Sequence, residues 1–189
     1  MADAAAVFNK AQDASSDDVS MARMIGMPYS NPPPRPAKSN YRCKMLSMPS
    51  LTLELDNRDQ LTAALDGGGW IVACLCAAWC GTCSSYRAGF DALAARHPDK
   101  TFVWIDVEDQ AGVVGDLDVE NFPTLLLQRD DVVAFYGTML PDLKVADRLV
   151  QAKAALAPDE LARLAASNEE RRGWQEACNL RTLLANAED

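Results

Sequence analysis

The pattern of apolar and polar residues becomes regular about fifty residues into the chain and predicts three elements in quick succession. Residues 51–55, LTLEL, alternate between apolar and polar side chains, as a half-buried strand does. Residues 57–66, NRDQLTAALD, have the spacing of a short amphipathic helix, with Asp56 or Asn57 as its N-cap. Residues 70–78, WIVACLCAA, are almost entirely apolar, which is typical of a central strand covered on both faces.

The pattern that follows continues this alternation and adds a hairpin. In order, it predicts a helix over about 82–96, a strand over 101–107, a weak helix or loop over 108–117, strands over 124–128 and 132–136, and a helix that opens with Pro141 and runs to residue 156. Alternating strands and helices followed by a hairpin favour an α/β fold, in which helices flank a central mixed sheet.

The two ends of the chain differ from this central part, so we divide the chain into three segments. Residues 1–50 contain six of the ten prolines and no apolar period, which favours a disordered or loosely docked leader. Residues 51–157 form the α/β domain. Residues 158–189 have a helical pattern and are expected to form a docked C-terminal extension. The side chains expected to pack inward from it include Trp174, Cys178 and Leu184.

The charge distribution and the apolar content restrict the expected partners. The net charge is −9, and residues 51–157 hold sixteen acidic against eight basic side chains. An acidic domain repels phosphate backbones, so we expect no nucleic-acid partner.

No stretch approaches the roughly 20 apolar residues of a membrane span. The first twenty residues lack the basic start and apolar region of a secretory signal. We therefore expect a cytoplasmic protein, in a compartment that keeps thiols reduced, with no membrane partner.

Four of the six cysteines lie within ten residues and carry the candidate chemistry. Two of them, Cys80 and Cys83, form a Cys-x-x-Cys at the junction of the apolar strand and the following helix. Free N–H groups and the helix dipole stabilise a thiolate at a helix N-terminus. Cys80 would then attack a substrate disulfide, and Cys83 would resolve the mixed disulfide. This pattern predicts thiol–disulfide exchange.

Other uses of these cysteines stay open on the residues alone. A zinc ion could draw on all four, but Cys74 and Cys76 lie inside the strand and point to one face, so the strand would have to break. We interpret these two as small buried apolar side chains. His97, the only histidine, lies beside Pro98 at a helix end and is expected to interact with the helix dipole. We therefore expect no metal site and no cysteine-hydrolase arrangement.

The sequence AAWCGTC, followed about forty residues later by ENFPTLLLQ, resembles the thioredoxin family. The resemblance covers roughly residues 51–157 and rests on two motifs and on the order of the elements. It implies a thioredoxin fold, with Cys80 as the attacking nucleophile and Cys83 as the resolving thiol. It also implies a cis Phe122–Pro123 bond.

The same resemblance implies a substrate-binding surface around the cysteines. Its expected members are Trp79, Gly81, Thr82, Phe122, Pro123 and Gly137, the last of them placed after the final strand. Some of these residues also have simpler interpretations. In these simpler interpretations, Trp79 and Phe122 are plain core aromatics and Pro123 is an ordinary trans proline at the start of an edge strand.

Three departures from the family pattern affect the expected chemistry. Thr82 replaces a proline between the cysteines, and its N–H and hydroxyl are extra donors that favour the thiolate, which predicts a more oxidising couple. Cys74 and Trp104 stand where the family has a buried aspartate and its lysine partner. Both charges are lost together, so no buried charge is orphaned, but Cys83 is expected to lose its proton less readily or by way of water. Ala88-Gly89 replaces a helix proline.

These observations predict an enzyme, a thiol–disulfide oxidoreductase that reduces protein disulfides in electron transport and cell redox homeostasis. No Gly-x-Gly-x-x-Gly follows a strand, so we expect no nicotinamide or flavin cofactor. The resemblance implies that a separate reductase, a thioredoxin reductase, supplies the electrons. The alternative is a thioredoxin-fold binding module or redox-sensitive chaperone that uses the cysteine pair as a switch.

Overall fold

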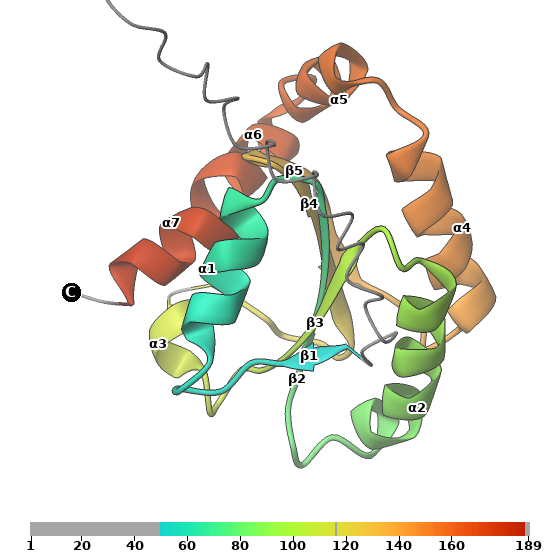
Figure 1. Cartoon of the computed structure of the whole chain (residues 1–189), viewed down its shortest axis with the longest axis vertical. Helices are drawn as coiled ribbons and strands as arrows, with labels where there is room; N and C mark the ends of the chain where they lie inside the picture. The colour runs from blue at the N-terminus through green and yellow to red at the C-terminus, as the bar shows by residue number, and fades with distance from the viewer. Residues whose placement is uncertain (1–49, 116, 188–189) are drawn as a thin grey trace, which may run out of the picture. The chain divides into compact units, whose positions relative to one another are not determined.

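The computed structural model describes residues 50–115 and 117–187, in which one five-stranded sheet lies between two layers of helices (Figure 1). The strands are β1 (Leu51–Thr52), β2 (Trp70–Cys76), β3 (Thr101–Asp106), β4 (Thr124–Arg129) and β5 (Val132–Thr138). They lie in the order β1-β3-β2-β4-β5. The first three of these run parallel, whereas β4 is antiparallel to both of its neighbours. The predicted mixed sheet is confirmed.

The described helices are α1 (Arg58–Asp66), α2 (Gly81–Arg96), α3 (Ala111–Val114), α4 (Leu143–Ala154), α5 (Pro158–Ala165), α6 (Glu169–Ala177) and α7 (Leu180–Asn186). One face of the sheet is covered by α2 and α4, and the opposite face by α1, α3 and α7 (Figure 1). Both α5 and α6 contact β5. The predicted arrangement, helices on both faces of a mixed sheet, is therefore also confirmed.

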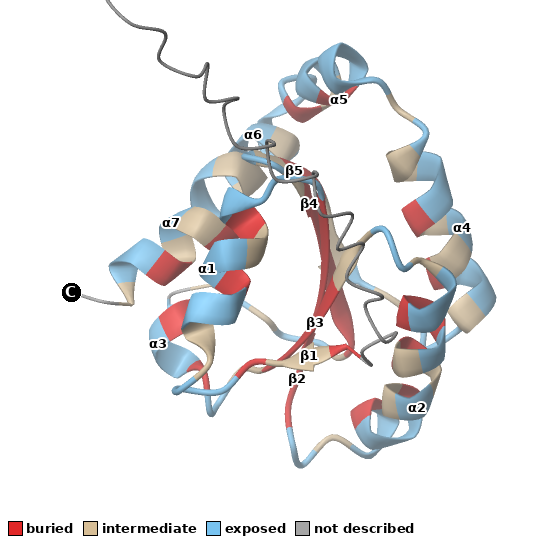
Figure 2. Ribbon diagram, in the orientation of Figure 1, coloured by how far each residue is buried: buried red, intermediate tan, exposed pale blue. Residues whose placement is uncertain are grey.

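The central strand β2 is buried along its whole length, which explains its nearly continuous apolar sequence (Figure 2). Its side chains alternate between two cores. Cys74 and Cys76 face the core that includes Phe90 of α2, whereas Leu75 faces the core that includes Leu61 of α1. Both cysteines of β2 therefore lie on the face of the sheet that α2 covers.

Several predicted element boundaries differ from the structure by a few residues, and two of the differences have local reasons. The first strand stops at Thr52, because the chain turns there: the Asn57 side chain accepts from the Glu54 N–H and donates to the Thr52 carbonyl. Asn57 is the N-cap residue of α1, but its side chain is used in this turn rather than in capping. Helix α4 begins at Leu143, two residues after the predicted Pro141, because the Asp142 carboxylate caps its first turn.

The C-terminal extension is helical, as predicted, and packs on the sheet through buried polar contacts. The Gln175 side chain accepts from the Val133 N–H at 2.9 Å and donates to the Val133 carbonyl at 3.0 Å, where β5 is irregular. Cys178 and Leu184 are buried, and the half-buried Trp174 stacks edge-on against Phe135. These contacts explain why α5–α7 belong to one compact unit with the sheet.

Two expectations from the sequence concern membranes and the N-terminal segment. Within the described residues, no helix is long and apolar enough to cross a membrane. The predicted leader, residues 1–50, lies outside the described residues except for Ser50.

Candidate active site

The candidate site is built where the chain passes from β2 into α2. After Cys76, the Cys80 N–H donates to the Ala77 carbonyl at 2.9 Å, which closes a tight turn. Cys80 then occupies the N-cap position of α2 in an extended conformation (φ −79°, ψ 108°), and its side chain makes no capping hydrogen bond. Cys83 lies in the first turn of α2. The predicted placement of the pair at a strand–helix junction is confirmed.

The two thiols lie in different environments. Cys80 is partly exposed, whereas only 2% of Cys83 is exposed. The Cys83 N–H, followed by the Cys83 thiol and the Thr82 N–H and hydroxyl, holds the pKa of Cys80 below its usual value. Burial, and then a hydrogen bond with the Cys76 thiol, raises the pKa of Cys83. The outer cysteine is therefore the better nucleophile at neutral pH, and the inner cysteine stays protonated.

The loop before β4 lies against the cysteine turn and brings an aromatic pair to it. The Phe122–Pro123 peptide bond is cis, as the resemblance implied. The Trp79 and Phe122 rings pack edge to face, with centroids 5.7 Å apart. Trp79 is 68% exposed, and its indole N–H donates to Glu108 at 2.9 Å. The interpretation of Trp79 as a plain core aromatic is therefore wrong, because the ring lies at the surface beside Cys80.

The other residues predicted for the substrate-binding surface differ in how far they are exposed. Gly81 and Thr82 are exposed, Phe122 is half-buried and Pro123 is buried. Gly137 lies inside β5, opposite Leu125, and not after the final strand as predicted, because β5 continues to Thr138. The shallow pocket that Gly137 lines contains none of the cysteines; its other residues are Asp118, Val119, Glu120, Asn121, Thr124, Tyr136 and Thr138.

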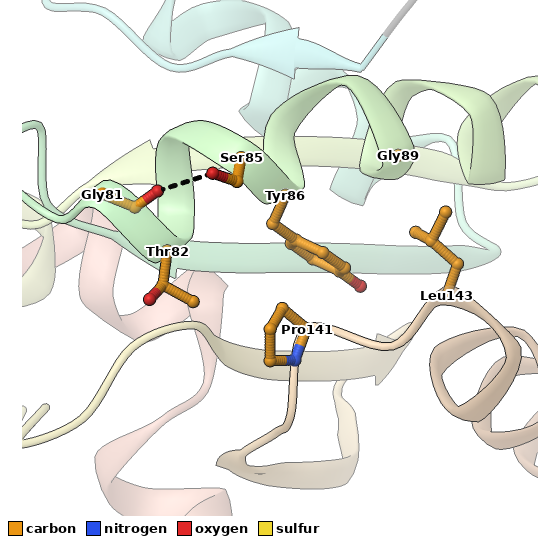
Figure 3. A pocket seen from close by; sticks show the side chains of 7 residues that line it. All are labelled: Gly81, Thr82, Ser85, Tyr86, Gly89, Pro141 and Leu143. Carbon is orange, nitrogen blue, oxygen red and sulfur yellow. Dashed lines mark hydrogen bonds between the residues drawn. The ribbon is translucent and has the colours of Figure 1, made fainter.

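A cleft of about 480 Å³ lies beside the cysteine turn, between α2 and the segment that leads into α4 (Figure 3). Its lining residues are Gly81, Thr82, Ser85, Tyr86, Gly89, Pro141 and Leu143. At Gly89, an added Cβ would lie 2.7 Å from Leu143, so glycine lets α4 approach α2 closely at this end. Gly89 is one of the two residues, Ala88-Gly89, that stand where the family has its helix proline, and the sequence alone did not explain this glycine.

Behind Cys83, thiols and aromatic rings occupy the positions at which the family has a buried charged pair. Cys74 is fully buried and pairs with Trp104 in the β2–β3 register. The Trp104 ring packs on Phe90 and, on its outer side, carries the Arg87 guanidinium at 4.8 Å. The Cys74 and Cys76 sulfurs are 3.6 Å apart. Both cysteines are buried side chains, as predicted.

Neither a metal site nor a histidine joins this cluster. In residues 50–115 and 117–187, no group of three or more His, Cys, Asp or Glu side chains could hold a metal ion. His97 follows the last turn of α2, at the end opposite Cys80, and its Nε2 lies 2.7 Å from the Asp147 carboxylate of α4. Its role is to join two helices.

Two contacts of the site were missed in the sequence. Glu108 follows β3 and meets Trp79 only because parallel strands bring their carboxyl ends to one edge of the sheet. The period-two spacing of Cys74 and Cys76 did signal a shared face, but it did not show that their sulfurs lie 3.6 Å apart.

The fold and the cysteine at the N-cap position of α2 define a protein of the thiol–disulfide oxidoreductase class, and comparison with known proteins agrees. The thioredoxin family model matches residues 54–139. A thioredoxin-like protein CXXS1 of Oryza sativa is 33% identical over 101 residues, which cover 52% of this chain and 76% of that protein. A thioredoxin of Echinococcus granulosus is 32% identical over 82 residues, which cover 43% of this chain and 76% of that protein.

A solved structure shows the same fold. A mutant thioredoxin from Halobacterium salinarum superposes with a TM-score of 0.50 at 23% identity, over 58% of this chain and 95% of that one. The chain belongs to the thioredoxin family.

Proposed function

We propose that this protein reduces protein disulfides through a dithiol–disulfide cycle at Cys80 and Cys83. The observation that carries the proposal is the asymmetry of the pair. Cys80 is accessible at the start of α2, where the Cys83 and Thr82 N–H groups help to lower its pKa. Cys83 is buried three residues later, with its pKa raised by burial.

The cycle begins when the Cys80 thiolate attacks one sulfur of a substrate disulfide. An S–S bond forms between Cys80 and the substrate, and the other substrate sulfur leaves as a thiolate. Cys83 then attacks the Cys80 sulfur, so that the Cys80–Cys83 bond forms and the second substrate sulfur leaves. Two electrons pass from the protein to the substrate, which takes up two protons.

The second step requires Cys83 to lose its proton in a core where the described residues place no buried carboxylate. The residues at the family's charged positions are Cys74 and Trp104, both buried. The pKa of Cys83 is raised, so its thiolate is scarce at neutral pH. We therefore propose that resolution of the mixed disulfide, not the first attack, limits the rate.

The substrate-binding surface that we propose surrounds Cys80. Exposed Trp79, Gly81 and Thr82 lie on one side of it, and half-buried Phe122 lies on the other. The Pro123 carbonyl already accepts from the Met139 N–H at 2.9 Å. The Phe122 backbone has no hydrogen-bond partner among the described residues. It is therefore the part of this loop that we expect to hydrogen-bond with an extended peptide. Gly137 borders this loop from β5, and its part in the surface is proposed on the resemblance alone.

The cycle needs an electron donor to return the disulfide to the dithiol. Membership of the thioredoxin family supports a separate reductase as this partner, and a thioredoxin reductase is the donor that we propose. A compartment that keeps thiols reduced, such as the cytoplasm, fits this role, and the sequence is the only support for that location.

The test is turnover with matched serine variants. The full chain should reduce insulin disulfides when a thioredoxin reductase and NADPH, or dithiothreitol, supply electrons. Cys80→Ser should lose the activity, and Cys83→Ser should instead accumulate a covalent adduct between Cys80 and the substrate. Cys178→Ser, which changes a buried thiol of the C-terminal extension, is the control and should keep the wild-type rate. Equal activity of the Cys80→Ser variant and the wild type would overturn the proposal and favour a binding module.

A further inference from the structure

The cleft beside the cysteine turn begins inside the Cys-x-x-Cys motif, and the proposed cycle does not use it. Gly81 and Thr82, the two residues between the cysteines, line one end of the cleft, and Gly89 and Leu143 line the other end (Figure 3). Its volume of about 480 Å³ lies within the range of about 300–1,000 Å³ that is typical of ligand pockets. A substrate bound at Cys80 would therefore lie next to an open cleft.

The Tyr86 hydroxyl lines this cleft and has no hydrogen-bond partner in the part of the chain that the structure describes. Tyr86 is only 4% exposed, and its ring lies beside that of Phe90, with centroids 6.2 Å apart. Its hydroxyl points into the cleft, between Pro141 and Leu143 (Figure 3). A polar group on a nearly buried side chain normally has a partner, so this hydroxyl favours a ligand that supplies a hydrogen bond.

The other side chains at the cleft favour a ligand that is mainly apolar. Pro141 and Leu143 form its wall on the side of α4. Leu140, directly before Pro141, is 78% exposed. The Met139 N–H donates to the Pro123 carbonyl at 2.9 Å, so this segment runs beside the cis-proline loop. An exposed apolar surface thus leads from the cis-proline loop to the cleft, as is typical of a binding site.

We propose that this cleft is a specificity subsite, which takes an aromatic side chain next to the reacting cysteine of the substrate and prefers tyrosine. This inference rests on the dithiol cycle proposed above, because the reacting cysteine must lie at Cys80. Tyr86 follows Cys80 by six residues, about 9 Å along α2, so the residue next to that cysteine is the one that reaches it. A tyrosine ring would pack on Leu143, and its hydroxyl would pair with the Tyr86 hydroxyl.

The test uses short peptides with a single cysteine, each oxidised to its disulfide-linked dimer. One series has tyrosine, phenylalanine or alanine directly before the cysteine, and a second series has them directly after it. The reduced full-length protein is mixed with each dimer, and acid quenching with mass spectrometry gives the rate constant of its oxidation. In at least one series, phenylalanine should react about tenfold faster than alanine, because its ring is buried in the cleft. Tyrosine should react about threefold faster than phenylalanine, because it adds a hydrogen bond.

Matched variants locate these preferences in the cleft. Tyr86→Phe should remove the preference for tyrosine over phenylalanine and keep that for phenylalanine over alanine. Ser85 and Ser84 are both exposed, and each hydroxyl donates to the carbonyl four residues earlier, but only Ser85 lines the cleft. Ser85→Phe, which fills the cleft, should remove both preferences, whereas Ser84→Phe should keep both.

Two results separate the failure of this inference from the failure of the proposed function. Equal rates for the three peptides in both series, or preferences that Tyr86→Phe leaves unchanged, would overturn the inference alone. Wild-type protein that reduces none of the peptides would instead overturn the proposed function.

Discussion

Two cysteines of this protein lie close to the start of a helix and have opposite properties. Cys80 is the N-cap residue of α2 and is partly exposed. Cys178 is the C-cap residue of α6, immediately before the N-cap of α7, and is 2% exposed. The N-cap of α7 is Asn179, whose side chain accepts from the Arg181 N–H. Burial raises the pKa of Cys178 to about 12.

The difference shows that the residue at the N-cap position of the helix determines whether the nearby cysteine is a reactive thiol. At α7 an asparagine uses the free N–H groups, and the neighbouring thiol is an apolar side chain of the core. At α2 the thiol itself is at the cap position, and the N–H groups of Thr82 and Cys83 lower its pKa. The start of α7 is stabilised by its asparagine cap, whereas the start of α2 stabilises a reactive thiolate.

The largest expected effect is the difference in thiol reactivity between these two ends. In the reduced folded protein at pH 7, iodoacetamide should alkylate Cys80 at least about a thousandfold faster than Cys178, because the thiolate is the reacting form. The Cys80 rate should rise with pH and level off above its lowered pKa. Mass spectrometry of each site over time measures both rates. Guanidinium should expose Cys178, and comparable rates before unfolding would contradict the contrast.

A smaller effect is expected on stability, when the polar contacts at the start of α7 are removed. The buried Asn179 side chain accepts from the Arg181 N–H and from Gln128, and donates to the Asp131 carbonyl. Asn179→Ala should lower the free energy of unfolding by about 1–3 kcal/mol, measured by denaturant titration, without changing the activity of the folded protein.

Asn168 is the matched control for this prediction, because it caps α6 through one exposed hydrogen bond to the Arg171 N–H. Asn168→Ala should cost less, about 0.5–1 kcal/mol. If the two variants lost the same stability, the buried contacts at α7 would add nothing to an ordinary cap.

The smallest expected effect is on the reduction potential, when the α2 end is made less favourable to a thiolate. Thr82→Pro removes the Thr82 N–H and hydroxyl, both of which lower the pKa of Cys80. The thiolate is then less stable, the disulfide is favoured, and the potential should fall by about 30 mV. Thr82→Val keeps the N–H and should give an intermediate value. A higher potential in Thr82→Pro would show that other groups stabilise the thiolate.

Much of this contrast was predictable from the sequence. The apolar run of β2 and the Cys-x-x-Cys at its end predicted a thiol at the start of α2, because strand and helix periods are local properties. The placement of Gly137 and the start of α4 were wrong by one or two residues, because a local pattern does not show how far β5 stays paired with β4 or which side chain caps the helix. The cap of α7 was not predicted either.

The packing of the thiols behind Cys83 was beyond sequence reasoning for a different reason. Period two correctly placed Cys74 and Cys76 on one face of β2. That this face belongs to the same core cluster as Cys83 depends on the turn closed between Ala77 and Cys80, which no periodicity reports.

The measurement that tests the central claim most directly is the redox titration of the Cys80–Cys83 pair in a glutathione series. Cys43→Ser and Cys178→Ser changes remove the two cysteines that lie outside residues 74–83. We predict a reversible two-electron transition between dithiol and Cys80–Cys83 disulfide, at a potential above that of the Thr82→Pro variant. A folded protein that forms no Cys80–Cys83 disulfide across the series would contradict the claim that this pair is the redox centre.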